Sequence, residues 1–496
     1  MNFRERLTEK IHLYDGSKGF LLMRRGLAPD ECPDAWNLLH PDIVYDIHKE
    51  YVDAGSDVIQ TNTMLGSRFH LEARGLYEKL GELNLAGVSL AKRAAGKRVS
   101  VAASVTSLGR LLAPFGELGF DAAIEAFKEQ IAALLGAGAD ILHFETFSDL
   151  SELRAAVIAA KELDSSVPVI ATVSIEGDGR TVMGDDAGCV CAALDSLGAD
   201  CAGANCGLGP RQMLSRFDLF APFRGPLCSK PNAGKPDSAG GAAVYGATDA
   251  EYYETCFGFA GLGARLVGGC CGSNPGQIRR MREAVDAMNA DKAYSYDATA
   301  GRAPEWNADT VRVSSQTLSA EFTRGDIARY AYGAIKTALS RLVPDGEPAY
   351  GETPDGKLLF ADLSGVRGTD RTVDILSEAS ESGAEATVFC FFNRRPAFGK
   401  PWVLRAPGGP GKLLAGSAGR AGDGAAAVLS DIAENARAYH KKPLMFFTDD
   451  PDGLKGAVRR YCGVTAAIMS AYMTPEETEG RLIAAAGDYG ADAVFI

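Results

Sequence analysis

The sequence predicts an N-terminal (β/α)8 barrel, a TIM barrel, followed by a second and smaller α/β domain. With 496 residues the chain is too long for one ordinary hydrophobic core. From residue 12 to about residue 288, short β-branched runs alternate with amphipathic stretches, and there are eight of each. Such alternation calls for parallel strands joined by crossover helices, and eight units close a sheet into a barrel.

The elements of the expected barrel can be assigned in chain order. The strands are expected at His12–Asp15, Ser56–Thr61, Val99–Val105, Ala139–Glu145, Val167–Ser174, Ala199–Asn205, Gly225–Lys230 and Ala264–Gly269. The helices are expected at Pro41–Ala54, Leu76–Ala95, Asp121–Leu135, Leu150–Leu163, Ala187–Leu197, Arg211–Phe220, Asp249–Ala260 and Pro275–Met288. In this fold the chemistry lies in the loops after the carboxyl ends of the strands, so functional residues are sought there.

The rest of the chain predicts a linker and a second α/β domain. We expect the barrel at 1–290, a polar linker at 291–312 and the second domain at 313–496. That domain is expected to begin with a helix at Asp326–Leu342 and to have a flexible Gly- and Ala-rich loop at 407–426. Its strands are expected at Lys357–Leu363, Glu385–Phe391, Pro443–Thr448, Val464–Ser470 and Ala491–Ile496. Five such units are too few for a barrel, so the domain is either an incomplete barrel or an open α/β sheet.

Composition narrows the function classes. The net charge of −13 argues against nucleic-acid or anionic-membrane partners, because those contacts require clustered Lys and Arg. No stretch reaches the roughly 18 apolar residues of a membrane span, and the positively charged first ten residues are not followed by the apolar region of a signal peptide. We therefore expect a cytoplasmic protein.

Three cysteines form a candidate metal site. Cys206 lies between Asn205 and Gly207, and the pair Cys270-Cys271 lies between glycines, so all three follow expected strands at one rim of the barrel. Two neighbouring thiolates on a tight turn can share a metal, and a third sulfur from across the rim completes the set. Zinc prefers such ligands, and three protein sulfurs leave a fourth position open for substrate, as in catalytic sites. A substrate thiol bound there loses its proton and becomes a nucleophile.

Three further polar residues are expected at the same rim. Asp15 ends the first strand, Glu145 ends the fourth, and Asn232 follows the seventh. Their position at this rim makes all three candidate functional residues.

Several runs resemble one known family in order and spacing. They are Asp15-Gly16-Ser17-Lys18-Gly19, Arg24-Arg25-Gly26-Leu27, residues 54–63 (AGSDVIQTNT), residues 145–149 (ETFSD), residues 203–206 (GANC), residues 231–236 (PNAGKP) and Gly269-Cys270-Cys271-Gly272. The stretch is similar to the homocysteine-binding zinc barrel of the homocysteine S-methyltransferase family, found in cobalamin-dependent methionine synthase and betaine–homocysteine methyltransferase.

The resemblance implies specific roles. Cys206, Cys270 and Cys271 would hold zinc, with Asn232 as a fourth ligand that substrate displaces. Asp15, with Gly16, and Glu145 would hold the amino group of homocysteine, and residues near Ser104 its carboxylate. The chain departs from the pattern at Thr106-Ser107, where methionine synthases usually have Gly-Pro. Of the implied contacts, those of the substrate carboxylate near Ser104 are therefore the least supported by the resemblance.

The second domain weakly resembles the pterin-binding barrel of methionine synthase. The positions where that family has Asp or Asn to grip the pterin align with Val388, Cys390, Phe447, Asp450 and Met469. Apolar residues would leave the polar groups of the pterin ring unsatisfied. We therefore do not expect this domain to bind folate in the usual way.

These observations lead to one principal hypothesis and two alternatives. The principal hypothesis is a methyltransferase that converts zinc-bound homocysteine to methionine. The chain has no Asp-x-His-x-x-Gly cobalamin motif, so a corrinoid donor would be carried by a separate protein. The first alternative is a betaine or sulfonium donor, and the second is a non-catalytic scaffold that binds zinc or thiols.

Overall fold

The computed structural model divides the chain into two compact units. One comprises Met1–Leu112 and Glu117–Ala303, and the other comprises Ala113–Gly116 and Pro304–Ile496. The structure describes residues 3–234, 245–295, 310–323, 349–352, 358–362, 372–391, 402–404, 412–414, 425–440, 442–448, 450–463, 465–469 and 476–495.

The first unit is an eight-stranded parallel barrel. Its strands are β1 (His12–Leu13), β2 (Val58–Gln60), β3 (Ser100–Val105), β4 (Ile141–Phe147), β5 (Val169–Val173), β6 (Cys201–Asn205), β7 (Leu227–Lys230) and β8 (Ala264–Val267). From β2 to β8 each strand pairs with the next in sequence, and β8 pairs with β1. A parallel bridge between Tyr14 and Val58 joins the first two strands and closes the ring. The sequence prediction of a (β/α)8 barrel is therefore confirmed.

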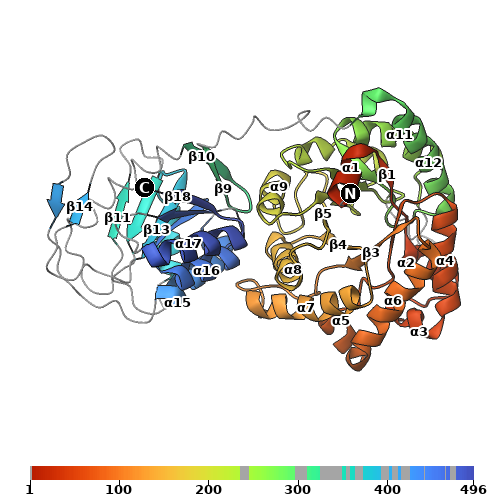
Figure 1. Ribbon diagram of the computed structural model, residues 1–496, viewed down its shortest axis with the longest axis horizontal. Helices are drawn as coiled ribbons and strands as arrows, with labels where there is room; N and C mark the ends of the chain where they lie inside the picture. The colour runs from red at the N-terminus through yellow and green to blue at the C-terminus, as the bar shows by residue number, and fades with distance from the viewer. Residues whose placement is uncertain are drawn as a thin grey trace. The chain divides into compact units, whose positions relative to one another are not determined.

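The helices surround the strands, as Figure 1 shows. They are α4 (Pro41–Asp53), α6 (Leu80–Ala95), α7 (Phe120–Gly136), α8 (Leu150–Leu163), α9 (Ala187–Ser196), α10 (Pro210–Leu214), α11 (Asp249–Gly261) and α12 (Pro275–Ala290). Side-chain caps fix several of their starts. Asp149 accepts from the N–H groups at the start of α8, and Asn274 does the same for α12. The helices therefore begin directly after the loops that carry the candidate site.

Four short helices were not predicted from the sequence: α1 (Phe3–Glu9), α2 (Lys18–Arg24), α3 (Trp36–Leu39) and α5 (Arg68–Glu72). Segments this short carry too little periodicity to be recognised. Helix α1 packs Phe3 and Leu7 against buried strand residues such as Val58, Ile141 and Leu266. It therefore covers the end of the barrel where the strands begin, opposite the candidate site. Helix α2 follows β1 and begins at Ser17, which accepts a hydrogen bond from Phe20 N.

The second unit contains an open six-stranded sheet. Its strands, in spatial order, are β11 (Ala349–Glu352), β12 (Leu358–Asp362), β13 (Ala386–Phe391), β16 (Leu444–Thr448), β17 (Ala466–Met469) and β18 (Asp492–Phe495). Strand β11 is antiparallel to β12, and the other pairs are parallel. The helices are α14 (Thr372–Ser380), α15 (Ala425–Tyr439), α16 (Pro451–Arg460) and α17 (Glu476–Asp488). Of the two expected architectures, the structure shows the open sheet.

Two expectations for this region need correction. An antiparallel hairpin of β9 (Thr310–Ser314) and β10 (Ser319–Thr323) begins inside the expected linker. Within the expected loop at 407–426, Lys412–Leu414 forms β15, which pairs with β14 (Trp402–Leu404). Both hairpins are too short to show a clear alternating pattern in the sequence. The expected helix at 326–342 lies outside the described residues.

Among the described residues, we find no helix that combines the length and the apolar character needed to cross a membrane.

Candidate metal and thiol-binding site

The three cysteines singled out in the sequence come together at the carboxyl ends of β6 and β8. The Sγ atoms of Cys206, Cys270 and Cys271 all lie within 4.8 Å of one another, and those of Cys206 and Cys271 are 3.7 Å apart. Within the described part of the chain, this is the only cluster of three or more His, Cys, Asp or Glu that could hold a metal. The cluster is partly exposed, so a ligand can reach it.

Backbone geometry holds the cluster together. Cys206 has a φ of 62°, which is uncommon for a residue with a side chain, and its N–H donates to Lys230 O at 3.1 Å. Cys270 N–H donates to Pro231 O at 2.8 Å, and Cys271 O accepts from Ala233 N at 2.8 Å. The loops after β6, β7 and β8 are thus bonded to one another. Strained backbone of this kind is typical of functional sites.

The cluster favours negative charge. Hydrogen bonds from the Cys270 and Cys271 thiols lower the pKa of Cys206 to about 3. The hydrogen bond to Cys206 raises the pKa of Cys270 to about 11. The mutual hydrogen bonds thus favour the thiolate on Cys206 over that on Cys270, and a divalent cation would favour loss of the remaining protons. Three sulfur donors at this spacing fit zinc.

Asn232 supports the cysteine pair. Its Oδ1 accepts a hydrogen bond from Cys271 N at 3.1 Å, and its side chain also donates to Cys206, which lowers the pKa of that thiol. The structure thus places Asn232 between the Cys206 sulfur and the backbone of Cys271. Its service as a fourth metal ligand remains a prediction.

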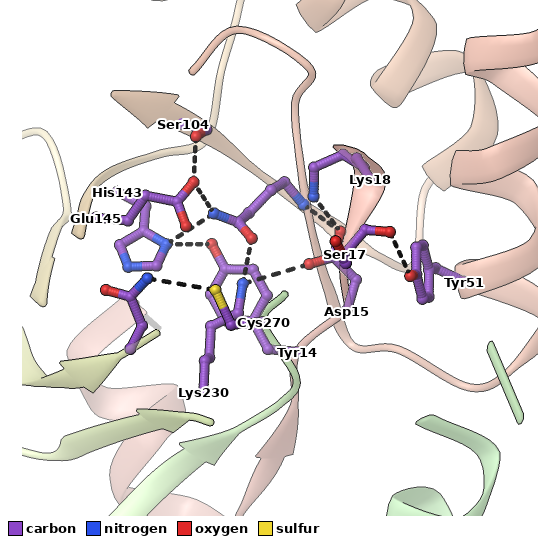
Figure 2. Close-up of polar contacts among 12 residues, drawn as sticks. Tyr14, Asp15, Ser17, Lys18, Tyr51, Ser104, His143, Glu145, Lys230 and Cys270 are labelled. Carbon is purple, nitrogen blue, oxygen red and sulfur yellow. Dashed lines mark hydrogen bonds and ion pairs between the residues drawn. The ribbon is translucent and has the colours of Figure 1, made fainter. Parts of the chain in front are cut away.

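A chain of hydrogen bonds leads from the barrel interior to the cluster, and Figure 2 shows its start, between Tyr14 and His143, and Cys270 at its end. Tyr14 Oη lies 3.0 Å from His143 Nδ1, and His143 Nε2 lies 3.0 Å from Thr172 Oγ1. The Thr172 hydroxyl donates to Asn205 Oδ1 at 2.6 Å, and Asn205 Nδ2 lies 3.6 Å from Cys270 Sγ. Burial lowers the pKa of His143 to about 3, so its ring is neutral. Such outer partners orient metal ligands.

Asp15 is fully buried and faces two lysines. Its Oδ2 accepts from Lys18 Nζ at 3.1 Å and from Gln60 N at 2.8 Å, and its Oδ1 lies 3.5 Å from Lys230 Nζ. Lys230 also donates to Gln60 Oε1 and lies 3.8 Å from the centre of the Tyr14 ring. Asp15 is therefore already balanced by positive charge.

Glu145 has neutral partners instead. Its Oε1 accepts from Gln60 Nε2 at 2.6 Å and from the Ser104 hydroxyl, and its backbone oxygen accepts from Thr106 Oγ1 at 2.8 Å. Ser104 thus lies at the site, but its hydroxyl donates a hydrogen bond to Glu145. Its expected contact with the substrate carboxylate remains a prediction. Gln60 joins the two carboxylates, because its backbone contacts Asp15 and its side chain contacts Glu145.

Gly16 has a packing reason to be glycine. A Cβ at this position would lie 2.6 Å from Ser273 Oγ and 2.9 Å from Tyr51 Oη. Any side chain would push the first loop away from the loop after β8. The role of Gly16 in binding substrate remains a prediction.

The sequence reasoning missed four site residues: Lys18, Gln60, His143 and Lys230. Gln60 and Lys230 end β2 and β7 at the same rim, so the rule that selected Glu145 would have found both. His143 lies within β4 and Lys18 starts α2, and neither position carries a signal in the sequence.

Comparisons with known proteins agree on the first unit. Residues 12–285 match the family model of homocysteine S-methyltransferase. Methionine synthase of Mycobacterium leprae is 31% identical over 302 residues, covering 58% of this chain and 25% of that protein. The Mycobacterium tuberculosis enzyme is 30% identical over 309 residues, covering 59% and 26%. The match thus spans about a quarter of these relatives. A structure of the Escherichia coli homocysteine methyltransferase MmuM is 22% identical with a TM-score of 0.48, covering 55% of this chain and 95% of that one.

Proposed function

The chain belongs to the homocysteine S-methyltransferase family, and on that basis we propose that it methylates homocysteine to methionine at the three-cysteine cluster. The observation that carries the proposal is the convergence of Cys206, Cys270 and Cys271 within 4.8 Å at the carboxyl rim of the barrel. We propose that these three residues hold zinc. When bound, zinc would lower the pKa of a substrate thiol and keep it as a thiolate at neutral pH.

The protein's own residues would position the two reactants. Asn205 and Asn232 orient Cys270 and Cys271 through the contacts described above. Glu145 would provide the negative charge that the ammonium end of an amino acid needs, and Asp15 would hold two lysines at the same rim. In the reaction the substrate sulfur forms a bond to the methyl carbon, and the donor leaves with the electron pair of the bond that breaks.

For the methyl donor, we propose a methylated corrinoid on a separate protein, with a betaine or sulfonium donor as the alternative. We also propose that the second unit does not bind folate. Val388 is buried in β13, and Asp450 caps α16 by accepting from Asp452 N at 3.1 Å, so neither side chain is free for a pterin. The structure does not describe the side chains of Cys390, Phe447 and Met469. We further propose that the enzyme works in the cytoplasm.

The test is methionine formation by the zinc-loaded full chain with homocysteine and each of four donors: methylcobalamin, methyltetrahydrofolate, betaine and S-methylmethionine. We expect turnover with one donor and its loss in Cys271→Ala. Turnover that survives in Cys271→Ala would overturn the role of the cluster. Binding of homocysteine without turnover with any donor would favour the non-catalytic alternative.

A further inference from the structure

We propose that Lys18 binds the carboxylate of the substrate, opposite Glu145, which is already expected to bind the ammonium group. The inference rests on the proposed function and deepens it, because it assigns the carboxylate end of the substrate to a named side chain. It also separates the two rim carboxylates, which sequence reasoning treated as equivalent partners of the amino group.

Asp15 is a poor partner for a substrate cation. Its buried carboxylate already faces the ammonium groups of Lys18 and Lys230 and accepts from Gln60 N–H. A third cation would be repelled by these two lysines at short range. Asp15 is therefore a positioning residue that holds the lysines in place.

The two lysines differ in what they can offer a ligand. Lys230 is 1% exposed and is engaged by Asp15, by Gln60 and by the face of the Tyr14 ring. The side chain of Lys18 is 11% exposed, and Asp15 is the only acceptor that the described residues give it. An ammonium group has three N–H donors, so Lys18 keeps two for a carboxylate that arrives from the rim.

Glu145 offers the complementary charge. It is 6% exposed and accepts hydrogen bonds from two neutral groups, the Gln60 amide and the Ser104 hydroxyl. No Lys or Arg of the described residues forms an ion pair with it. A buried carboxylate without a cationic partner favours a ligand that supplies one.

Both groups are anchored next to the sulfur cluster. Gly269 N–H, one residue before Cys270, donates to Asp15 O at 3.1 Å, and Asp15 holds Lys18. On the other side, Thr146 N–H donates to Asn205 Oδ1 at 2.8 Å, and Asn205 contacts Cys270 Sγ. Figure 2 shows Glu145 and Lys18 to either side of Cys270. One residue of each sign is therefore linked, through Asp15 or through Thr146 and Asn205, to the segment or the sulfur of the cluster.

The test compares thiols that differ in one charge. Homocysteine, its methyl ester, 3-aminopropane-1-thiol and 4-mercaptobutyrate are titrated calorimetrically into the zinc-loaded full chain, and into Lys18→Met and Lys18→Arg. Zinc content and thermal unfolding are measured on each protein. Loss of one charge-assisted hydrogen bond is expected to weaken binding roughly 10- to 100-fold.

We expect Lys18→Met to weaken the binding of homocysteine and of 4-mercaptobutyrate by that factor. The binding of 3-aminopropane-1-thiol, which has no carboxylate, should not change. Lys18→Arg should restore part of the loss. Equal weakening of all thiols would mean that Lys18 only supports the fold of the site, and no weakening would mean that another group binds the carboxylate. Either result overturns this inference while homocysteine still binds the wild type. Absence of zinc, or of any thiol binding by the wild type, would instead overturn the proposed function.

Discussion

The amide of Asn205 has its nitrogen 3.6 Å from Cys270 Sγ, and its orientation is fixed by its other contacts. Asn205 Oδ1 accepts both the Thr172 hydroxyl at 2.6 Å and Thr146 N–H at 2.8 Å. Because only the carbonyl end of the amide can accept, Nδ2 must be the end that faces the sulfur. Asn205 therefore donates toward Cys270 and stabilises negative charge on it.

The first prediction follows from this contact. Asn205→Ala should weaken zinc binding by roughly 10- to 100-fold, as loss of an outer partner typically does. The measurement is zinc affinity by competition with a chelator. Thr172→Val serves as the control. It removes a hydroxyl that contacts Asn205 and not the sulfur, so it should reduce zinc affinity less. Equal effects of the two variants would contradict a direct role for Asn205.

The second prediction separates the cluster from other cysteines. Cys271→Ala should abolish stoichiometric zinc binding, because two sulfurs are too few for a tight site. The matched control is Cys256→Ala, since Cys256 is fully buried in α11 and burial raises its pKa to about 12. Metal analysis after dialysis should give one zinc per chain for this control. Zinc retained by Cys271→Ala would show that the metal lies elsewhere.

The third prediction concerns close packing between β6 and β7. Gly203 pairs with Cys228, and a Cβ on Gly203 would overlap the carbonyl oxygen of Cys228. Gly203→Ala should therefore lower the free energy of unfolding of the first unit by about 1–3 kcal/mol. Gly81→Ala in α6 meets nothing within 4 Å and should leave stability unchanged or raise it by up to about 1 kcal/mol. Chemical denaturation measures both, and equal effects would refute the packing argument.

The fourth prediction is a pH dependence of stability. Burial raises the pKa of Asp34 from 3.8 to about 7, so the folded state binds a proton more tightly than the unfolded state. This contribution is complete below about pH 4 and is lost as the pH rises through about 7. Asp34→Asn should remove that loss, gaining at most about 4 kcal/mol at pH 8 relative to its effect at pH 4. Denaturation curves at both pH values test this, and a pH-independent difference would contradict it.

The sequence predicted the barrel and the convergence of the three cysteines, because both depend on the order of elements along the chain. The βα alternation fixes strand order, and the rule that chemistry follows the strands brought Cys206, Cys270 and Glu145 to one rim. It could not show that Asp15 would be balanced by two lysines. Lys18 lies only three residues away, but its ion pair depends on the turn between β1 and α2. Lys230 comes from β7, far along the chain. The hairpins of the second unit were missed because strands of three to five residues carry little periodicity.

The closure of the barrel at β1 has a consequence for local opening. This strand has two residues. The bridge between Tyr14 and Val58 joins its side of the ring to the next strand, with backbone hydrogen bonds from Asp57 N to Leu13 O and from Asp15 N to Val58 O. The Asp57 carboxylate adds a hydrogen bond to Leu13 N at 2.8 Å and an ion pair with Arg282 at 2.8 Å. With so few bonds to break, amide protons at this junction should exchange with solvent before those of the other strand pairs. Local opening of the barrel would then begin at this junction, beside Asp15.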